Sequence, residues 1–280
     1  MLSTKIYKQK RSLVAFEGIL VIIGLAFLYP FYIMLFVAVK SGREAIMSPA
    51  SFPREWHFEN FLIAGKKMKF FLTFFNSFTV TAVAVFGVVL LAGMASFIIV
   101  KSRSKFVRSL YLLFISGTII PFFTSMVPLI RIMGDLNLLN SRLGLSLVYI
   151  GKALPFAIFL YAGFIRSLPN SIIESVQIDG ANRWQTYWSI IFPMIKPITA
   201  TVVIVDVLWF WNDFLLPLLT LGKRRLNTIP MVQNHFHNEF ATQWELSFAV
   251  FVLAMIPVLL VFFALQKYVV SGMTSGALKG

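Results

Sequence analysis

The stretch Glu174-Ser-Val-Gln-Ile-Asp179-Gly180-Ala181 lies between two hydrophobic runs and is followed by Phe192-Pro193-Met-Ile-Lys-Pro197. Ser171-Ile-Ile-Glu174 has the pattern of a capping box, which predicts the start of a short helix. Gly180 is expected to end this helix, because glycine readily takes the left-handed conformation found after a last helical turn. A second amphipathic run, Trp184 to Phe192, precedes two prolines that are expected to stop it. The stretch therefore predicts a polar helix-turn-helix whose apolar face needs a protein partner.

The composition of the chain around this stretch is that of a membrane protein. Hydrophobic residues make up 58% of the 280 residues, charged residues make up 13%, and the mean hydropathy is +0.82. A soluble globular domain carries about 25% charged residues, so that class is excluded. The chain has no cysteine, which excludes disulfides, thiolate catalysis and cysteine-ligated metal sites.

Six apolar segments are long enough to cross a hydrocarbon core of about 30 Å. The first follows a basic N-terminus without a small-residue cleavage site, so it is interpreted as a retained signal anchor. The chain is thus predicted to be an all-α, polytopic membrane protein with six transmembrane helices. The predicted spans are Leu13 to Val39, Asn76 to Val100, Ser109 to Ile130, Leu145 to Phe164, Ile198 to Leu219 and Ser247 to Leu265.

The orientation follows from clusters of basic residues beside the spans. The cluster between Lys5 and Arg11 and the cluster between Lys101 and Arg108 are short and dense, which places both on the cytoplasmic side. The N- and C-termini and the helix-turn-helix stretch then also lie in the cytoplasm. Basic residues also gather in the predicted external loops, among them Lys40, Arg43 and Arg54. Such a face would bind lipid headgroups, or would attract an acidic binding protein or an anionic substrate.

The stretch resembles the cytoplasmic coupling loop of permeases of binding-protein-dependent ABC importers, in which Glu-Ala-Ala, three residues and Gly precede an apolar-Pro pair. Ser175 and Val176 replace the usual two alanines. Trp211-Asn212-Asp213 and the C-terminal run from Ser271 to Gly280 are similar to the carbohydrate branch of this family, of the maltose-transporter type. The resemblance implies a type I importer permease formed by one domain, residues 1–280, with a coupling loop at 167–197 and a tail at 268–280.

The resemblance also implies roles for particular residues. Residues expected to contact or shape the ATPase interface are Glu174, Ser175, Asp179, Gly180, Ala181, Phe192 and Pro193, with Gly272, Gly276 and Lys279 in a tail that reaches the ATPase dimer. The implied partners are a second, different permease, two ATPase subunits and an extracytoplasmic binding protein, in a bacterial inner or plasma membrane and in contact with its lipid. The implied substrate is a sugar or oligosaccharide, and no nucleic-acid partner is expected.

No nucleotide-binding or hydrolytic motif occurs in the sequence: there is no Gly-x-x-x-x-Gly-Lys-Ser/Thr, His-Glu-x-x-His or Gly-x-Ser-x-Gly. The chain is therefore interpreted as a transport subunit and not as an enzyme. It is expected to bind no cofactor itself, while ATP and Mg²⁺ are bound by the partner ATPase. ATP-driven closure of that partner would rock the spans from inward-open to outward-open.

Polar residues inside the spans are candidates for a substrate path, because their burial in lipid is costly. Asp206, Trp209, Phe210 and Asp213 have i, i+3, i+4, i+7 spacing, beside Asn212, and Lys152 is expected at a depth similar to that of Asp213. Aromatic rings that stack on sugars and carboxylates that accept hydroxyl hydrogen bonds suit a carbohydrate route. Alternatively, Lys152 and Asp213 form a structural ion pair between helices.

His235, His237 and Glu239 would share a face if extended, which could suggest a metal. The segment is interpreted instead as part of a solvated external loop between Gly222 and Glu245, and no metal site is predicted.

Two other functions fit some of these features. An ion-coupled secondary transporter would use Asp206, Asp213 and Lys152 as its ion relay, and an ABC importer permease could also carry a non-sugar solute. The importer hypothesis predicts loss of transport when Glu174 or Gly180 is changed and tolerance of Asp206→Asn, whereas the ion-coupled hypothesis predicts the reverse.

Overall fold

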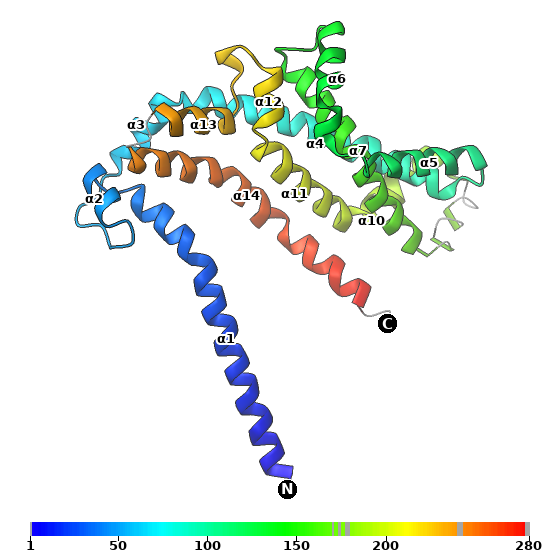
Figure 1. Ribbon diagram of the computed structural model, residues 1–280. Helices are drawn as coiled ribbons and strands as arrows, with labels where there is room; N and C mark the ends of the chain where they lie inside the picture. Colours follow the sequence, from blue (N-terminus) through cyan, green and yellow to red (C-terminus); the bar gives the residue numbers. More distant parts are fainter. Residues whose placement is uncertain (1, 170, 173–174, 177–179, 240–242, 278–280) are drawn as a thin grey trace. The chain divides into compact units, whose positions relative to one another are not determined.

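The computed structural model describes residues 2–169, 171–172, 175–176, 180–239 and 243–277, and its regular elements in these ranges are all helical (Figure 1). The longer helices are α1 (Leu2–Val37), α4 (Phe70–Lys101), α5 (Lys105–Gly117), α6 (Phe122–Asp135), α7 (Arg142–Ser167), α11 (Lys196–Asn212), α13 (Ile229–Glu239) and α14 (Trp244–Ala277). The shorter ones are α2 (Gly42–Met47), α3 (Glu59–Lys67), α9 (Arg183–Thr186), η1 (Tyr187–Ile191), α10 (Phe192–Met194), α12 (Leu215–Thr220) and η2 (Arg224–Leu226).

The chain divides into two compact units. One unit comprises Met1–Lys69 and Gln233–Met255, and the other comprises Phe70–Val232 and Ile256–Gly280. The chain passes from the first unit to the second within α14 as well as between α3 and α4.

The core of the second unit is built where α4 packs along α7 and α11 packs on both (Figure 1). Small side chains such as Ala84 and Ala92 line the buried face of α4, which lets the helix backbones approach closely. Ser96 Oγ donates a hydrogen bond to the Ile158 carbonyl at 3.2 Å, and Ser146 Oγ donates to the Val80 carbonyl at 3.1 Å. These bonds satisfy buried hydroxyls between two helices of low overall polarity.

Four helices are long and apolar enough to cross a membrane, and the number rises to six if each of two bent pairs forms one span. The four lie at Phe16–Val37, Phe70–Lys101, Arg142–Ser167 and Trp244–Lys267, which correspond to the predicted first, second, fourth and sixth spans. The all-α, polytopic class is confirmed.

The predicted third span is not one continuous helix. It is broken between α5 and α6, which meet at an angle of 105°. Pro121 immediately precedes α6, and proline has no backbone N–H and disfavours helical geometry at the residue before it. Hydropathy did not indicate this break, because the segments on both sides of it are apolar.

The predicted fifth span, Ile198 to Leu219, is also interrupted. Helix α11 ends at Asn212, and Asp213 has an extended conformation with φ −71° and ψ 123°. Its Oδ1 accepts hydrogen bonds from the backbone N–H groups of Leu215, at 3.1 Å, and Leu216, at 3.4 Å. Asp213 therefore serves the start of α12 as a helix-capping acceptor and is not the last residue of a helical face.

Lys40, predicted as part of a basic external face, is fully buried in the first unit. Its Nζ donates to the carbonyls of Ser48 (2.6 Å), Pro49 (3.0 Å) and Ser51 (2.6 Å), and also to Ser51 Oγ (3.2 Å). Burial lowers the pKa of Lys40, although the nearby Glu44 carboxylate opposes this shift. The prediction was wrong for Lys40, because its ammonium group binds backbone carbonyls of the loop after α1 instead of facing solvent.

Two further expectations are corrected by helix formation. The segment from Gly222 to Glu245 is not simply a loop, since α13 covers Ile229–Glu239 and contains His235 and His237. Residues two apart do not share a face of a helix, so the extended-chain arrangement of that segment does not apply. Residues 268–277, predicted as part of a Gly-rich tail, continue α14 as far as Ala277.

Candidate functional site

The first part of the coupling loop ends at Gly180, as the sequence predicts. Residues 171–172 and 175–176 are helical, and Gly180 has φ +86°. The backbone N–H of Ala181 donates to the Val176 carbonyl at 3.2 Å. A left-handed glycine followed by this six-to-one bond is the Schellman arrangement, which only glycine adopts without strain from a Cβ atom. Glu174 and Asp179, named above as interface residues, lie outside the described residues.

A second capping box follows directly, at a position that the sequence analysis did not identify. Asn182 Oδ1 accepts from the backbone N–H of Gln185, and Gln185 Oε1 accepts from the backbone N–H of Asn182, both at 2.9 Å. This reciprocal pair begins α9. The signal was available in the sequence as Asn-x-x-Gln. The pattern Ser171-x-x-Glu174 remains untested, because Glu174 lies outside the described ranges.

Pro193 does not stop the second helical run. The π-helix η1 widens the turn before it, and α10 then includes Pro193 and ends at Met194. The π turn spreads the backbone hydrogen bonds over five residues, which makes room for a residue without an N–H donor. The chain turns only at Ile195, where Arg183–Met194 and Lys196–Asn212 meet at 73°.

The coupling segment, residues 180–195, packs onto α4 through Tyr187. This side chain is only 2% exposed, and its ring lies 5.8 Å from that of Phe97. The absence of a side chain at Gly93 permits the contact, since a Cβ there would lie 2.6 Å from Tyr187 Oη. Trp188 packs beside Tyr187 at 5.0 Å between ring centroids, and Trp184, which contacts Trp188, is 59% exposed. The segment is thus anchored in the core through Tyr187 and leaves Trp184 exposed in the described chain.

The polar residues of the proposed path divide into two groups. Asp206 and Phe210, one helical turn apart on α11, are buried, and Asp206 is only 1% exposed. Trp209 and Asn212 are exposed, and the ring of Trp209 lies 5.5 Å from that of Phe156 on α7. These residues thus differ in exposure, and Asp213 lies beyond the end of α11, so the four do not form one continuous exposed face.

Tyr149 on α7 joins two of these residues and was missed by the sequence analysis. Its ring stacks on Phe210 at 4.6 Å, and its hydroxyl donates to Asp213 Oδ2 at 3.0 Å. Lys152 instead lies with its Nζ 4.1 Å from the centroid of the Phe122 ring. The alternative ion pair between Lys152 and Asp213 is thus not formed. A tyrosine in an apolar helix carries no distinctive sequence signal, so only the fold reveals its partner.

The predicted tail contacts are described only in part. Gly272 and Gly276 lie on the last turns of α14, and Lys279 lies outside the described residues. Within the described ranges, no group of three or more His, Asp or Glu side chains has the arrangement of a metal site.

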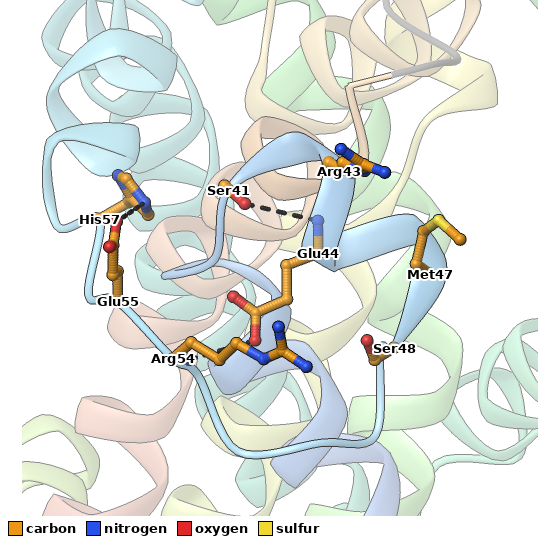
Figure 2. Close-up of a pocket in the computed structure, with 8 residues that line it drawn as sticks. All are labelled: Ser41, Arg43, Glu44, Met47, Ser48, Arg54, Glu55 and His57. Atoms are coloured by element: carbon orange, nitrogen blue, oxygen red, sulfur yellow. Dashed lines mark hydrogen bonds and ion pairs between the residues drawn. The ribbon is translucent and has the colours of Figure 1, made fainter.

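The loop after α1 encloses an open polar pocket of about 660 Å³ in the first unit. Figure 2 shows Glu44 directed toward Arg54, with His57 on the other side of the loop. Glu44 Oε1 accepts from the Arg54 backbone N–H at 3.1 Å. His57 Nδ1 lies 2.6 Å from Glu59 Oε1, and this hydrogen bond lowers the pKa of Glu59. The residues lining the pocket are Ser41, Arg43, Glu44, Met47, Ser48, Arg54, Glu55 and His57.

Several apolar spans, two of them interrupted, and a Gly-closed polar segment packed on the span core define a polytopic membrane protein. The chain belongs to the family described as binding-protein-dependent transport system inner membrane component, which matches residues 89–275. This confirms the resemblance to importer permeases. It also favours ATP-driven import over the ion-coupled alternative and identifies a multi-pass transport subunit rather than an enzyme.

Similar proteins cover nearly the whole chain. The melibiose/raffinose/stachyose import permease protein of Bacillus subtilis (strain 168) is 33% identical, over 92% of this chain and 94% of its own. The multiple sugar-binding transport system permease protein of Streptococcus mutans is 35% identical, over 91% and 93%. A bacterial ABC transporter involved in import of the acidic polysaccharide alginate has a similar fold, with TM-score 0.79, 23% identity and coverage of 91% and 95%.

Proposed function

We propose that this chain is the permease subunit of a bacterial ABC importer that moves a sugar or oligosaccharide into the cytoplasm. The observation that carries the proposal is the coupling segment, which is closed by left-handed Gly180 and packed on α4 through Tyr187 in a chain of this family. The names of the relatives from Bacillus subtilis and Streptococcus mutans support a sugar as substrate.

The proposed assembly contains this chain as a single permease domain, residues 1–280, with a second, different permease. Two ATPase subunits hold ATP and Mg²⁺, and an extracytoplasmic binding protein delivers the sugar. Both termini and the coupling segment lie in the cytoplasm, and the complex lies in the inner or plasma membrane. The family's description, binding-protein-dependent transport, supports the presence of the binding protein.

The packing of the coupling segment suggests how force reaches the spans. Tyr187, Ile191 and Ile195 are buried in the same core as α4 and α7. When the ATPase moves the exposed face of the segment, the buried face carries α4 with it, because closely packed elements move as rigid bodies. Glu174 and Asp179 would supply polar contacts to the ATPase, and Gly180 would preserve the turn between the two helical parts.

The remaining predicted residues take supporting roles in this proposal. Ser175, Ala181, Phe192 and Pro193 shape the segment that enters the ATPase, and Gly272, Gly276 and Lys279 lie near a second ATPase contact. Of the path residues, Trp209, Asn212 and Lys152 are exposed and available to substrate in this structure. Asp206 and Phe210 are buried and support the path from behind its surface. Tyr149 joins Phe210 to Asp213 and so holds Asp213 in position.

The proposal is tested by purifying the tagged chain from its native membrane as wild type, Gly180→Val and Gly163→Val. A side chain at Gly180 is strained by its positive φ, whereas Gly163 on α7 has open space where its Cβ would lie. We expect the ATPase to co-purify, and labelled sugar to be imported, with the wild type and Gly163→Val but not with Gly180→Val. Equal ATPase recovery and equal uptake in all three would contradict the assigned coupling role.

A further inference from the structure

Lys152 places a positive charge in the middle of a membrane-spanning helix. It lies ten residues after the start of α7, or about 15 Å along its axis. The side chain is exposed in the described chain, and its Nζ lies 4.1 Å from the centroid of the Phe122 ring. An uncompensated charge at this depth is costly in lipid, so such residues face a water-filled route or a partner of opposite charge.

No carboxylate of the described residues neutralises Lys152. Lys152 takes part in none of the ion pairs of the described residues, and the pairs of Glu55 and Glu59 are with His57. Asp213, the acid expected nearby, accepts hydrogen bonds from the Tyr149 hydroxyl and from backbone N–H groups instead. The chain thus presents a cation at mid-span whose counter-charge must come from outside the described residues.

The surroundings of Lys152 have the features of a carbohydrate site. Phe156 lies one helical turn further along α7, and its ring contacts that of Trp209, which is 47% exposed. Asn212 is exposed three residues after Trp209, and Gly151 leaves open space beside the lysine. An exposed indole ring can stack on a sugar, an amide can bond its hydroxyls, and an ammonium group binds an anionic oxygen.

We propose that this face, formed by Lys152, Phe156, Trp209 and Asn212, binds a sugar that carries an anionic group, such as a uronic acid. The inference rests on the proposed import function and specifies its substrate class. The acidic group supplies the charge that Lys152 lacks, while the neutral part of the sugar stacks on Trp209. A carboxylate and a sulfonate share this chemistry, and both belong to the proposed class.

The test measures ATP-dependent uptake by the complete importer in membrane vesicles, with the co-expressed partner subunits. The two probes are a labelled disaccharide containing glucuronic acid and the same disaccharide with its carboxyl reduced to an alcohol. The variants are Lys152→Met, which removes the charge, and Lys152→Arg, which keeps it. Arg166→Met is the control, because Arg166 lies in the last turn of the same helix with its guanidinium 5.0 Å from the centroid of the Tyr111 ring.

We expect the wild type to prefer the acidic probe by about tenfold or more, the effect of one good charged contact. Lys152→Met should lose this preference and keep uptake of the neutral probe, whereas Lys152→Arg and Arg166→Met should keep the preference. An unchanged preference in Lys152→Met would overturn the inference. So would reduced recovery of the second permease with no change in selectivity, because Lys152 would then pair with an acid of that subunit.

The substrate class and the import function can be refuted separately. Uptake of the neutral probe alone by the wild type would overturn the anionic class and leave the import function standing. If neither probe is imported and no ATPase co-purifies, the proposed function itself fails.

Discussion

The contact between Gly93 and Tyr187 can be tested by a double-mutant cycle. In Gly93→Ala, the added Cβ would lie 2.6 Å from Tyr187 Oη, well inside normal contact distance. The tyrosine cannot easily move away, because its ring is surrounded by those of Phe97, Trp188 and Phe192 at 5.0 to 6.1 Å. The substitution should therefore strain the attachment of the coupling segment to α4.

The structure also sets the magnitude of each step. Overpacking of this kind costs about 1–3 kcal/mol, which is offset by about 1 kcal/mol from the better helix propensity of alanine. Tyr187→Phe should be neutral or stabilising by about 1 kcal/mol, because its buried hydroxyl has no hydrogen-bond partner among the described residues. In the double variant the residue at position 187 has no hydroxyl oxygen. Its nearest atom is then Cζ, 3.7 Å from the new Cβ, which is an ordinary contact. The strain is then relieved, and the coupling energy should be about 1–3 kcal/mol.

The free energies can be measured by unfolding the purified chain in mixed micelles and following tryptophan fluorescence. Gly163→Ala provides the control, since its Cβ would meet nothing within 4 Å and its effect should add to that of Tyr187→Phe. If Gly93→Ala costs as much in the Tyr187→Phe background as in the wild type, the proposed packing of the coupling segment on α4 is wrong. The same four proteins can be assayed for transport, where Gly93→Ala alone should uncouple ATP hydrolysis from uptake.

Further outcomes are expected for variants at four other positions. Gly144→Ala should destabilise the chain by about 1–3 kcal/mol, because its Cβ would overlap a backbone carbonyl oxygen, whereas Gly151→Ala on the same helix should stabilise it by up to about 1 kcal/mol in thermal or denaturant unfolding. Tyr149→Phe removes the donor to the Asp213 carboxyl group and should cost about 1–2 kcal/mol in the same assay, with no change expected if that hydrogen bond is absent. Lys40→Met should speed limited proteolysis in the loop after α1, because three backbone carbonyls lose their common donor. The pKa of Lys40 is lowered in the folded loop, so between that pKa and 10.5 the unfolded loop binds more protons than the folded loop. The folded loop therefore becomes more stable as the pH rises through this window. Protection from proteolysis should rise with pH in the wild type but not in Lys40→Met.

Much of the architecture could be predicted from local sequence because the bilayer restricts what apolar segments can do. Four of the expected spans are continuous helices, since a long apolar segment in lipid must satisfy its backbone hydrogen bonds within itself. Gly180 could be assigned to a helix end because only glycine takes the left-handed geometry without strain. The family could likewise be identified from the short pattern around that turn.

Other features depended on tertiary contacts that no local pattern encodes. Hydropathy is insensitive to a bend, so the interruption before Pro121 and the extended conformation of Asp213 did not appear as breaks in apolar segments. The spacing of Asp206 and Trp209 suggested a shared face, but neighbouring helices cover one residue and leave the other exposed.

The sequence alone predicts an apolar membrane protein whose Gly-closed polar loop resembles that of importer permeases, and the family match confirms this class. The tertiary structure decided which polar groups remain available. It pairs Asp213 with Tyr149, directs Lys40 into backbone carbonyls and leaves Lys152 without an acidic partner in the described residues. The physical reason is that composition and spacing report local preferences, whereas the partner of a charge depends on which helices pack beside it.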